Sequence, residues 1–245
     1  MNNLMRAEWF RLRRTGLIKL ILFIDICAVI MQFVGDGLEI NVLHFCRNGI
    51  IGPCLAISGV SGIVCGTFDN RVVHYEIMKG TPPLLTILSK TLMSLCIVTA
   101  AYFLPTVILL ILFDGAALTF PIILLAFVCI AKLTVFYTAM CIIFNGISGM
   151  VIAIFATAFS TMPLVILQNV AHINVVPLVS YLTNAQLMLI GKLPELEIEQ
   201  MAMPLDNSNI ELKVIISFIV LSAVTILTAY KLLKERKQVG LMEIR

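Results

Sequence analysis

The sequence predicts an all-α membrane protein with six transmembrane helices, and three observations lead to that prediction. Of the 245 residues, 60% are hydrophobic and only 13% are charged, whereas a soluble domain carries about 25% charged residues. Six stretches are apolar over roughly the 20 residues that a helix needs to cross a bilayer. Basic residues gather on one side of these stretches, as they do on the cytoplasmic flanks of membrane proteins. We therefore expect lipid to surround most of the chain.

The predicted spans follow one another along a single membrane domain, residues 1–245. They cover approximately residues 17–35, 49–67, 91–113, 119–143, 147–167 and 212–232. A seventh apolar stretch, residues 176–191, is short for a crossing and carries Ser180, Thr183, Asn184 and Gln186. We expect it to form a re-entrant or interfacial external helix between spans five and six.

The distribution of charge predicts the orientation of the spans. Six crossings place both termini on one side, and that side then holds thirteen of the seventeen Lys and Arg residues. The opposite side holds Arg47, Lys192 and Lys213 together with eight acidic residues. Because basic residues collect on cytoplasmic flanks, both termini are expected in the cytoplasm. A seventh span would place the basic tail outside and undo this agreement.

The segment before the first span predicts an amphipathic helix over residues 3–15. Met5, Trp9 and Leu12 recur at helical spacing with Phe10 beside them. Other positions carry basic side chains that point elsewhere, namely Arg6, Arg13 and Arg14. Trp and Arg suit the lipid interface, so we expect an elbow helix that lies on the cytoplasmic leaflet beside a partner subunit. The alternative is a plain basic anchor.

The loop between spans two and three, residues 68–90, predicts a short cytoplasmic helix over residues 70–79. Asp69 or Asn70 can cap its amino end and Gly80 can close it, because Pro82 and Pro83 forbid its continuation. The helix mixes apolar and polar side chains: Val72, Val73, Tyr75, Ile77 and Met78 with Arg71, His74, Glu76 and Lys79. Such a surface is typical of a helix that docks in a groove of another protein. The alternative is a helix that rests on the membrane surface.

A long external segment, residues 168–211, separates spans five and six. It joins the short apolar helix to an acidic stretch, LPELEIEQMAMPLD, over residues 193–206. Segments of this length are uncommon without a function. The segment either caps the mouth of a pathway or meets a cationic substrate, or it is a solvated acidic loop.

Two charges inside the predicted spans are the most specific candidates for function. Asp25 lies in span one and Lys132 in span four, both near mid-depth. A charge there costs about 2.5–3.5 kcal/mol on insertion scales. We expect the two side chains to face each other or a shared cavity. The alternative is two groups that are hydrated or neutralised independently.

Small residues on span two predict a close helix contact. Gly59, Gly62 and Gly66 lie there with Ser58 and Ser61, and glycines four residues apart let membrane helices approach closely. We expect this face to pack against another span or another subunit.

The sequence lacks the motifs of nucleotide binding and hydrolysis. It contains no GxxxxGK[ST], HExxH or GxSxG, and its three histidines are far apart. The seven cysteines are scattered without a CxxC pair, which favours neither a disulfide framework nor a zinc site. The net charge is only +3. We expect no catalysis, bound cofactor, metal or nucleic-acid partner for this chain.

The order of these parts resembles the small six-span permease subunits of type-2 ATP-binding-cassette exporters, especially those for peptide export and for lantibiotic or bacteriocin immunity. The likeness covers essentially the whole chain and rests on order and spacing. Such permeases begin with an amphipathic elbow, to which the matching residues here are Trp9, Phe10, Arg11, Arg13 and Arg14, preceded by Glu8. They carry re-entrant external helices, matching residues 176–191, and a short basic tail, matching residues 231–245.

The resemblance also implies a coupling helix between spans two and three. Family members place there an acidic residue, a glycine, a proline turn and a lysine that opens span three, matching Glu76, Gly80, Pro82 or Pro83, and Lys90. The residues expected to contact the ATPase are Asn70, Val73, Tyr75, Glu76, Ile77, Met78, Lys79 and Gly80. The turn often has an arginine after its proline, and residues 81–85 have none.

What the resemblance implies is a division of labour in a bacterial cell membrane. Two copies of a separate ATPase subunit would bind ATP and Mg and drive this permease together with a second one, identical or homologous. The expected cargo is an amphipathic or antimicrobial peptide, moved by alternating access. The same scaffold serves drugs, lipids or ions, and an ATPase-independent channel, a peptide-sequestering immunity protein and a membrane enzyme are the remaining alternatives.

Overall fold

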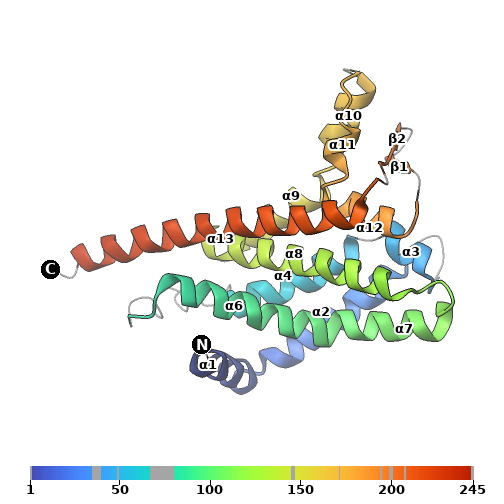
Figure 1. Ribbon diagram of the computed structural model, residues 1–245. Helices are drawn as coiled ribbons and strands as arrows, with labels where there is room; N and C mark the ends of the chain where they lie inside the picture. The colour runs from blue at the N-terminus through green and yellow to red at the C-terminus, as the bar shows by residue number, and fades with distance from the viewer. Residues whose placement is uncertain are drawn as a thin grey trace.

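Long apolar helices dominate the computed structural model (Figure 1). It describes residues 2–34, 40–48, 50–66, 80–144, 147–170, 172–193, 195–198, 201–206 and 208–243. Within these ranges four helices are long and apolar enough to cross a membrane, and a fifth candidate is a pair of helices bent by 85°. The composition and the helices together confirm a mainly helical, membrane-embedded protein.

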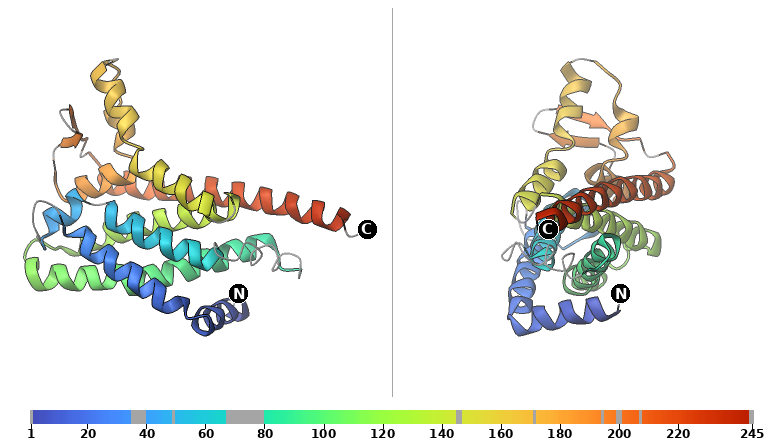
Figure 2. Two further views of the ribbon diagram at one scale, coloured as in Figure 1. Left: turned by 180° about the vertical axis from the view of Figure 1, so that it is seen from behind. Right: turned by 90° about the vertical axis from the view of Figure 1, so that its left-hand side faces the viewer.

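Most of the helices lie side by side in one bundle (Figures 1 and 2). Its members are α2 (Leu17–Gln32), α4 (Ile51–Cys65), α6 (Pro83–Val98) with its continuation through the π-helix η1 (Thr99–Phe103) into α7 (Leu104–Asp114), α8 (Phe120–Phe144), α9 (Ile147–Ala158) and α13 (Ile210–Glu243). α8 is the central helix, because it packs against α4, α6, α9 and α13. Burial on several sides explains why α8 is apolar all round rather than on one stripe.

These helices overlap the six expected spans but differ in their bounds. Expected span five, residues 147–167, is interrupted, because α9 ends at Ala158 and the next helix begins at Met162. Span three begins at Pro83 rather than near residue 91, since proline is well suited to the first turn of a helix. α2 and α4 have 16 and 15 residues, fewer than the roughly 20 of a straight crossing. The existence of the six helical segments follows from the sequence, while six full crossings stay a prediction.

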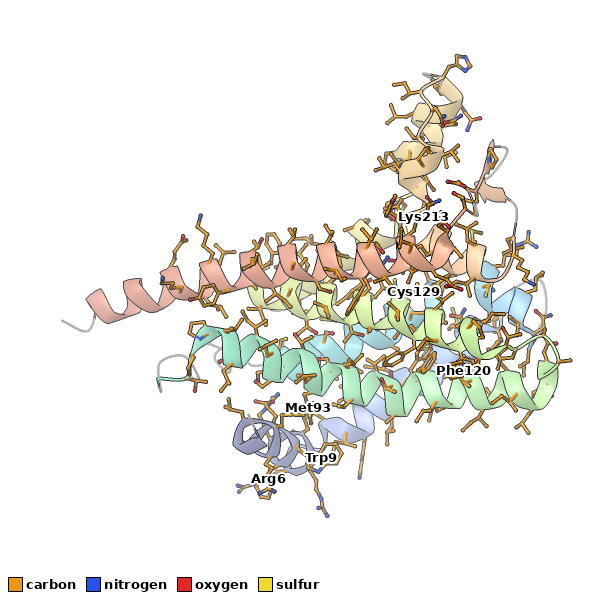
Figure 3. The ribbon with its side chains drawn as sticks, in the orientation of Figure 1. Arg6, Trp9, Met93, Phe120, Cys129 and Lys213 are labelled. Carbon is orange, nitrogen blue, oxygen red and sulfur yellow. The ribbon has the colours of Figure 1, made fainter. Side chains whose placement is uncertain are left out.

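The amino-terminal helix α1 (Asn2–Arg14) forms where the amphipathic segment predicts it. Gly16, with φ of 71°, separates it from α2, a conformation that favours glycine, and the two helices are bent by 85°. Leu12 is fully buried against the bundle, whereas Trp9 and Phe10 are 50% and 66% exposed. Figure 3 shows Trp9 and Arg6 on this helix at the margin of the bundle.

The segment between α9 and α13 departs most from the expectation. α10 (Met162–Val170) and α11 (Val176–Val179) rise away from the bundle, as Figures 1 and 2 show. Residues 176–191 are not one helix, because a turn at residues 180–182 separates α11 from α12 (Thr183–Ile190). Seven of the eight residues of α12 are buried, and this helix packs against α8, α13 and the short α3 (Val42–Arg47).

The acidic stretch forms a short hairpin rather than an irregular loop, so the chain is not purely α-helical. Strand β1 (Glu195–Ile198) pairs antiparallel with β2 (Met201–Pro204). The hairpin lies at the same end of the molecule as α3 and α12 (Figure 1).

A buried glutamine ties four elements together at this end. The side-chain nitrogen of Gln32 donates to the carbonyl of Phe45 at 2.8 Å. Its side-chain oxygen accepts from the backbone N–H of Gly52 at 3.1 Å and from the hydroxyl of Tyr102 at 3.2 Å. Because Gln32 is fully buried, these bonds satisfy polar groups that could not reach water. They join α2, α3, α4 and η1.

Two glycines mark close helix contacts. A Cβ added at Gly59 would lie 2.8 Å from Cγ2 of Ile24 on α2, so the small-residue face of α4 packs against another helix of the same chain at this point. A Cβ at Gly149 would lie 2.7 Å from Cα of Cys141. The second contact is with backbone, which cannot move aside as a side-chain tip can.

We expect Gly149→Ala to lower the free energy of unfolding by about 1–3 kcal/mol, because the added methyl group forces α8 and α9 apart. Thermal or denaturant unfolding in detergent measures the change. Ser148→Ala is the matched control, since Ser148 is exposed on the same turn. Equal stability of the two variants would contradict the close contact.

An ion pair holds the link that enters α13. Nζ of Lys213 donates to Oδ2 of Asp206 at 2.6 Å and to its backbone carbonyl at 3.1 Å. The hydrogen bonds from Lys213 and Ser208 hold the pKa of the Asp206 carboxyl well below its ordinary value. A depressed pKa contributes stability that is present above the unfolded pKa, about 3.9, and is lost as the pH falls further.

The protection of backbone amides at the start of α13 against hydrogen exchange should therefore depend on pH. We expect the amide protection of residues 213–216, the first amides of α13 that bond to carbonyls four residues earlier, to decrease between pH 6 and pH 3 after correction for intrinsic rates. Asp206→Asn should show weaker protection at pH 6 and no further pH-dependent loss. An unchanged acid response in this variant would place the titrating group elsewhere.

Candidate functional site

The predicted coupling segment joins α4 to α6 at the end of the bundle that carries α1. Residues 67–79 lie outside the described residues, so the ATPase-contacting positions Asn70, Val73, Tyr75, Glu76, Ile77, Met78 and Lys79 stay predictions. Gly80 is described and has φ of 92°, the left-handed conformation typical of a residue just past a helix. The elements on both sides of this segment can be described in full.

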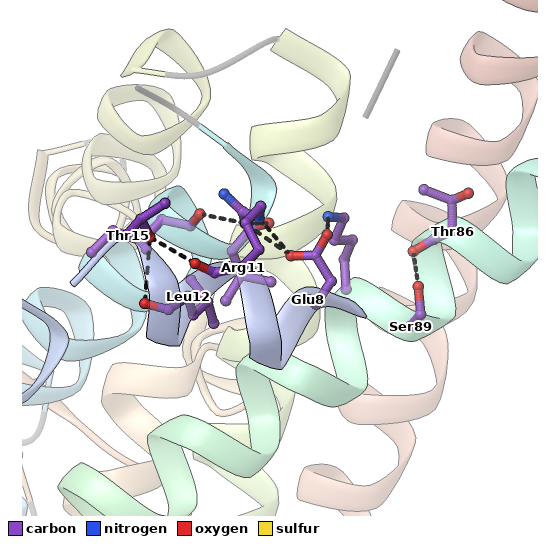
Figure 4. Close-up of polar contacts among 9 residues, drawn as sticks. Glu8, Arg11, Leu12, Thr15, Thr86 and Ser89 are labelled. Carbon is purple, nitrogen blue, oxygen red and sulfur yellow. Dashed lines mark hydrogen bonds and ion pairs between the residues drawn. The ribbon is translucent and has the colours of Figure 1, made fainter. Parts of the chain in front are cut away.

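A buried ion-pair network connects these flanking elements to α1 (Figure 4). Nζ of Lys90 on α6 donates to Oε1 of Glu8 at 2.5 Å. Nη2 and Nε of Arg11 donate to Oε2 of the same carboxylate at 2.8 and 3.1 Å. Lys90 is fully buried and Glu8 is 4% exposed. One carboxylate on α1 thus neutralises a charge that α6 carries into the bundle.

The same arginine also binds the end of α4. Nη2 of Arg11 lies 3.2 Å from the carbonyl oxygens of both Ile63 and Val64. The last carbonyls of a helix lack partners within the helix and carry partial negative charge. A guanidinium there satisfies these groups and also binds the Glu8 carboxylate. The network therefore fixes α1 to the end of α4 and to the beginning of α6.

Two hydroxyl groups close to the network bind backbone carbonyls of their own segments. The hydroxyl of Thr15 donates to the carbonyl of Arg11 at 2.8 Å at the end of α1. The hydroxyl of Ser89, next to Lys90, donates to the carbonyl of Thr86 at 2.9 Å. Each bond is local to one helix, so neither bond links α1 to α6.

The remaining elbow residues point away from the bundle, unlike Arg11. Arg13 and Arg14 are exposed, as are Trp9 and Phe10. The helix thus presents Glu8, Arg11 and Leu12 to the bundle and its aromatic side chains outward. The helical spacing alone predicted Trp9 and Leu12 on one face, but the ion pair sets the rotation of α1.

The two intramembrane charges do not meet. The Nζ atom of Lys132 donates to the side-chain oxygen of Gln186, to the hydroxyl of Ser217 at 3.1 Å and to the carbonyl of Tyr181 at 3.5 Å. Asp25 is fully buried, and neither carboxyl oxygen has a hydrogen-bond partner in the structure. The expected direct pair is therefore absent, because residue counts give depth in the membrane but not the direction in which a side chain points.

Gln186 is the centre of the cluster around Lys132. Its Nε2 atom donates to the hydroxyl of Ser217 at 3.0 Å and to the carbonyl of Lys213 at 3.3 Å. The thiol of Cys129 also approaches its side-chain oxygen, at 3.9 Å. Figure 3 shows Cys129 and Lys213 toward the end of the bundle that carries α12. The polar residues of the short helix were visible in the sequence, but nothing there indicated Lys132 as their partner.

The described residues contain no group of three His, Cys, Asp or Glu side chains placed to hold a metal ion. Comparison of the chain with protein-family models, curated proteins and solved structures finds no match. The assignment of function thus depends on the sequence and on the geometry above.

Glu8→Gln should lower the free energy of unfolding by about 3 kcal/mol, because it removes the carboxylate that offsets the buried charge of Lys90. Lys90→Met should lower it by less, because Arg11 still pairs with Glu8. The double variant should lose less than the sum of the single losses. Denaturant unfolding in detergent measures all three. Arg14→Met, an exposed change on the same helix, should remain within about 0.5 kcal/mol of the parent.

Strict additivity of Glu8→Gln and Lys90→Met would show that the two side chains are not coupled. A loss of comparable size in Arg14→Met would instead indicate a general sensitivity of α1.

Proposed function

We propose that this protein is the membrane permease subunit of an exporter powered by a separate ATP-binding-cassette ATPase. The observation that supports the proposal best is the Glu8–Lys90–Arg11 network, which joins α1 to the helix ends on either side of residues 67–79. A segment that receives force from a partner needs firm attachment to the helices that it moves. The network joins the two helices that flank this segment to α1, so that a force on the segment acts on one connected unit.

The finer topology belongs to the same proposal. Six crossings are made by α2, α4, α6–α7, α8, α9–α10 and α13, with α1 as the elbow on the cytoplasmic leaflet of a bacterial cell membrane. α1 and the carboxyl end of α13 lie toward the same end of the bundle (Figure 1), which agrees with both termini in the cytoplasm. α11, α12 and the hairpin then belong to the external side.

The proposed mechanism transmits motion from the ATPase to the bundle. Two ATPase subunits bind ATP and Mg, close, and displace the helix of residues 70–79 in a groove on their surface. Because Arg11 holds the end of α4 and Glu8 holds Lys90 of α6, the two helices and α1 move as one unit. A second permease, identical or homologous, forms the other wall of the pathway.

The cargo follows from the resemblance rather than from geometry. We propose amphipathic or antimicrobial peptides, which the apolar faces of the bundle can admit from lipid. This chain performs no catalysis in the scheme, and hydrolysis of ATP takes place on the partner.

Co-purification tests the proposal directly. The full chain, expressed with the products of neighbouring genes and isolated in detergent, should carry an ATPase whose turnover rises with a candidate peptide. Tyr75→Asp with Ile77→Asp should remove the ATPase, because charges disrupt an apolar docking face. Tyr75→Phe with Ile77→Leu is the matched control and should retain it.

Variants of the network distinguish binding of the ATPase from transmission of its motion to the bundle. The Glu8→Gln/Lys90→Met variant should retain the ATPase and lose most of its peptide stimulation. A chain that is isolated alone, with no ATP hydrolysis by any neighbouring product, would refute the exporter and favour a channel or a peptide-sequestering protein.

A further inference from the structure

A cavity opens beside Lys132, apart from the network at the other end of the bundle. Its volume is about 440 Å³, and it lies between α8, α9, α13 and residues 181–183. Apolar side chains form most of its wall: Leu133, Phe136, Ile216, Val220, Leu221 and Val224. Its volume falls within the range of about 300–1,000 Å³ that small-molecule sites occupy.

Lys132 is the one basic side chain in the wall of this cavity among the residues that the structure describes. It occupies position 13 of the 25 residues of α8 (132 − 120 + 1), halfway along the helix. Its side chain is 1% exposed, so bulk water does not solvate the ammonium group. A charge placed this deep requires compensation from its surroundings.

The surroundings solvate the charge but do not neutralise it. Every hydrogen-bond partner of Lys132 described above is neutral: an amide oxygen of Gln186, the hydroxyl of Ser217 and the carbonyl of Tyr181. No Asp or Glu within the described ranges forms an ion pair with Lys132. The ion pairs found there join Glu8 to Arg11 and Lys90, and Asp206 to Lys213. The cluster keeps a net charge of +1.

The bond to Tyr181 is the longest of the three and the easiest to exchange. At 3.5 Å it lies beyond the usual range of about 2.7–3.2 Å for N–H···O bonds. Tyr181 lines the cavity together with Lys132 and Ser217. A ligand oxygen in the cavity can therefore replace this carbonyl while Gln186 and Ser217 continue to hold the ammonium group.

We propose that this cavity binds an amphiphile with a single carboxylate, whose head group pairs with Lys132 and whose apolar chain lies between α8 and α13. A singly charged head matches the single uncompensated cation, whereas a dianionic phosphate would bring a second charge into apolar walls. A fatty acid and the free carboxyl end of an apolar peptide share this chemistry. The inference concerns binding alone and does not depend on a partner ATPase.

Binding to the full chain in phosphatidylcholine nanodiscs tests the proposal, with empty nanodiscs as the baseline. The probes are dodecanoate and its uncharged counterpart dodecanol, and an acetylated apolar tripeptide acid and its amide. At least one acid should bind about ten- to hundredfold more tightly than its neutral counterpart, the range that a charge-assisted hydrogen bond supplies. The arm that shows the preference identifies the source of the carboxylate.

Two variants locate the site. Lys132→Met should abolish the preference for the acid while leaving binding of the neutral counterpart within about twofold. Leu221→Trp should fill the cavity and weaken both probes, whereas Ile219→Trp, at a 58% exposed position of α13 outside the cavity wall, should bind as the parent does. The Trp pair keeps the test decisive if Lys132→Met does not fold.

The proposal is overturned if neither acid is preferred over its neutral counterpart, or if Leu221→Trp binds the acid as tightly as Ile219→Trp does. A preference that survives in folded Lys132→Met overturns it equally. Loss of the ATPase in co-purification leaves these outcomes unchanged, so failure of the exporter proposal and failure of the carboxylate site can be told apart.

Discussion

A charged side chain enclosed by apolar surroundings needs an opposite charge or polar protein groups around it, and this constraint organises both ends of the bundle. At one end Lys90 of α6 is buried, and Glu8 of α1 neutralises it at 2.5 Å. The position and rotation of α1 follow from that contact, since Arg11 must share the same carboxylate and cap α4. Trp9 and Phe10 are left exposed, which suits the proposed elbow at the membrane interface.

The second buried lysine has a different environment, and the difference distinguishes a structural ion pair from the proposed binding site. Lys90 meets a carboxylate of its own chain, which offsets its charge directly. Lys132 meets an amide, a hydroxyl and a carbonyl beside a cavity with apolar walls. A completed ion pair resists exchange, because either partner alone is costly to bury. A cation that is bound only by neutral groups, as Lys132 is, can bind an anion in place of its longest hydrogen bond, the one to the Tyr181 carbonyl.

The sequence predicts elements well where the local signal is strong and fails where distance in the chain matters. The long apolar runs and the prolines and glycines that bound them predict the main helices. The contact between Glu8 and Lys90 spans 82 positions, and no periodicity indicates it. The single helix expected at residues 176–191 is split by a turn at residues 180–182, and Gln186 of its second half binds Lys132, a contact that no local pattern indicates. The hairpin had a signal: Leu196 and Ile198 alternate with acidic residues at the period of a strand, but the apolar composition favoured an all-helical prediction.

The two ends of the bundle are connected through α8. On α8, Thr138 shares a hydrogen bond of 3.2 Å with Ser61 of α4. Ser61 lies three residues before Val64, one of the two residues whose carbonyls Arg11 binds. Tyr137, the neighbour of Thr138, shares a bond of 2.7 Å with Thr157 of α9, which lines the cavity. Closely packed helices shift as units rather than deform continuously. In the proposed exporter, a displacement of α4 and α6 by the ATPase therefore moves α8 against α9 and α13, the helices that form the walls of the proposed carboxylate site.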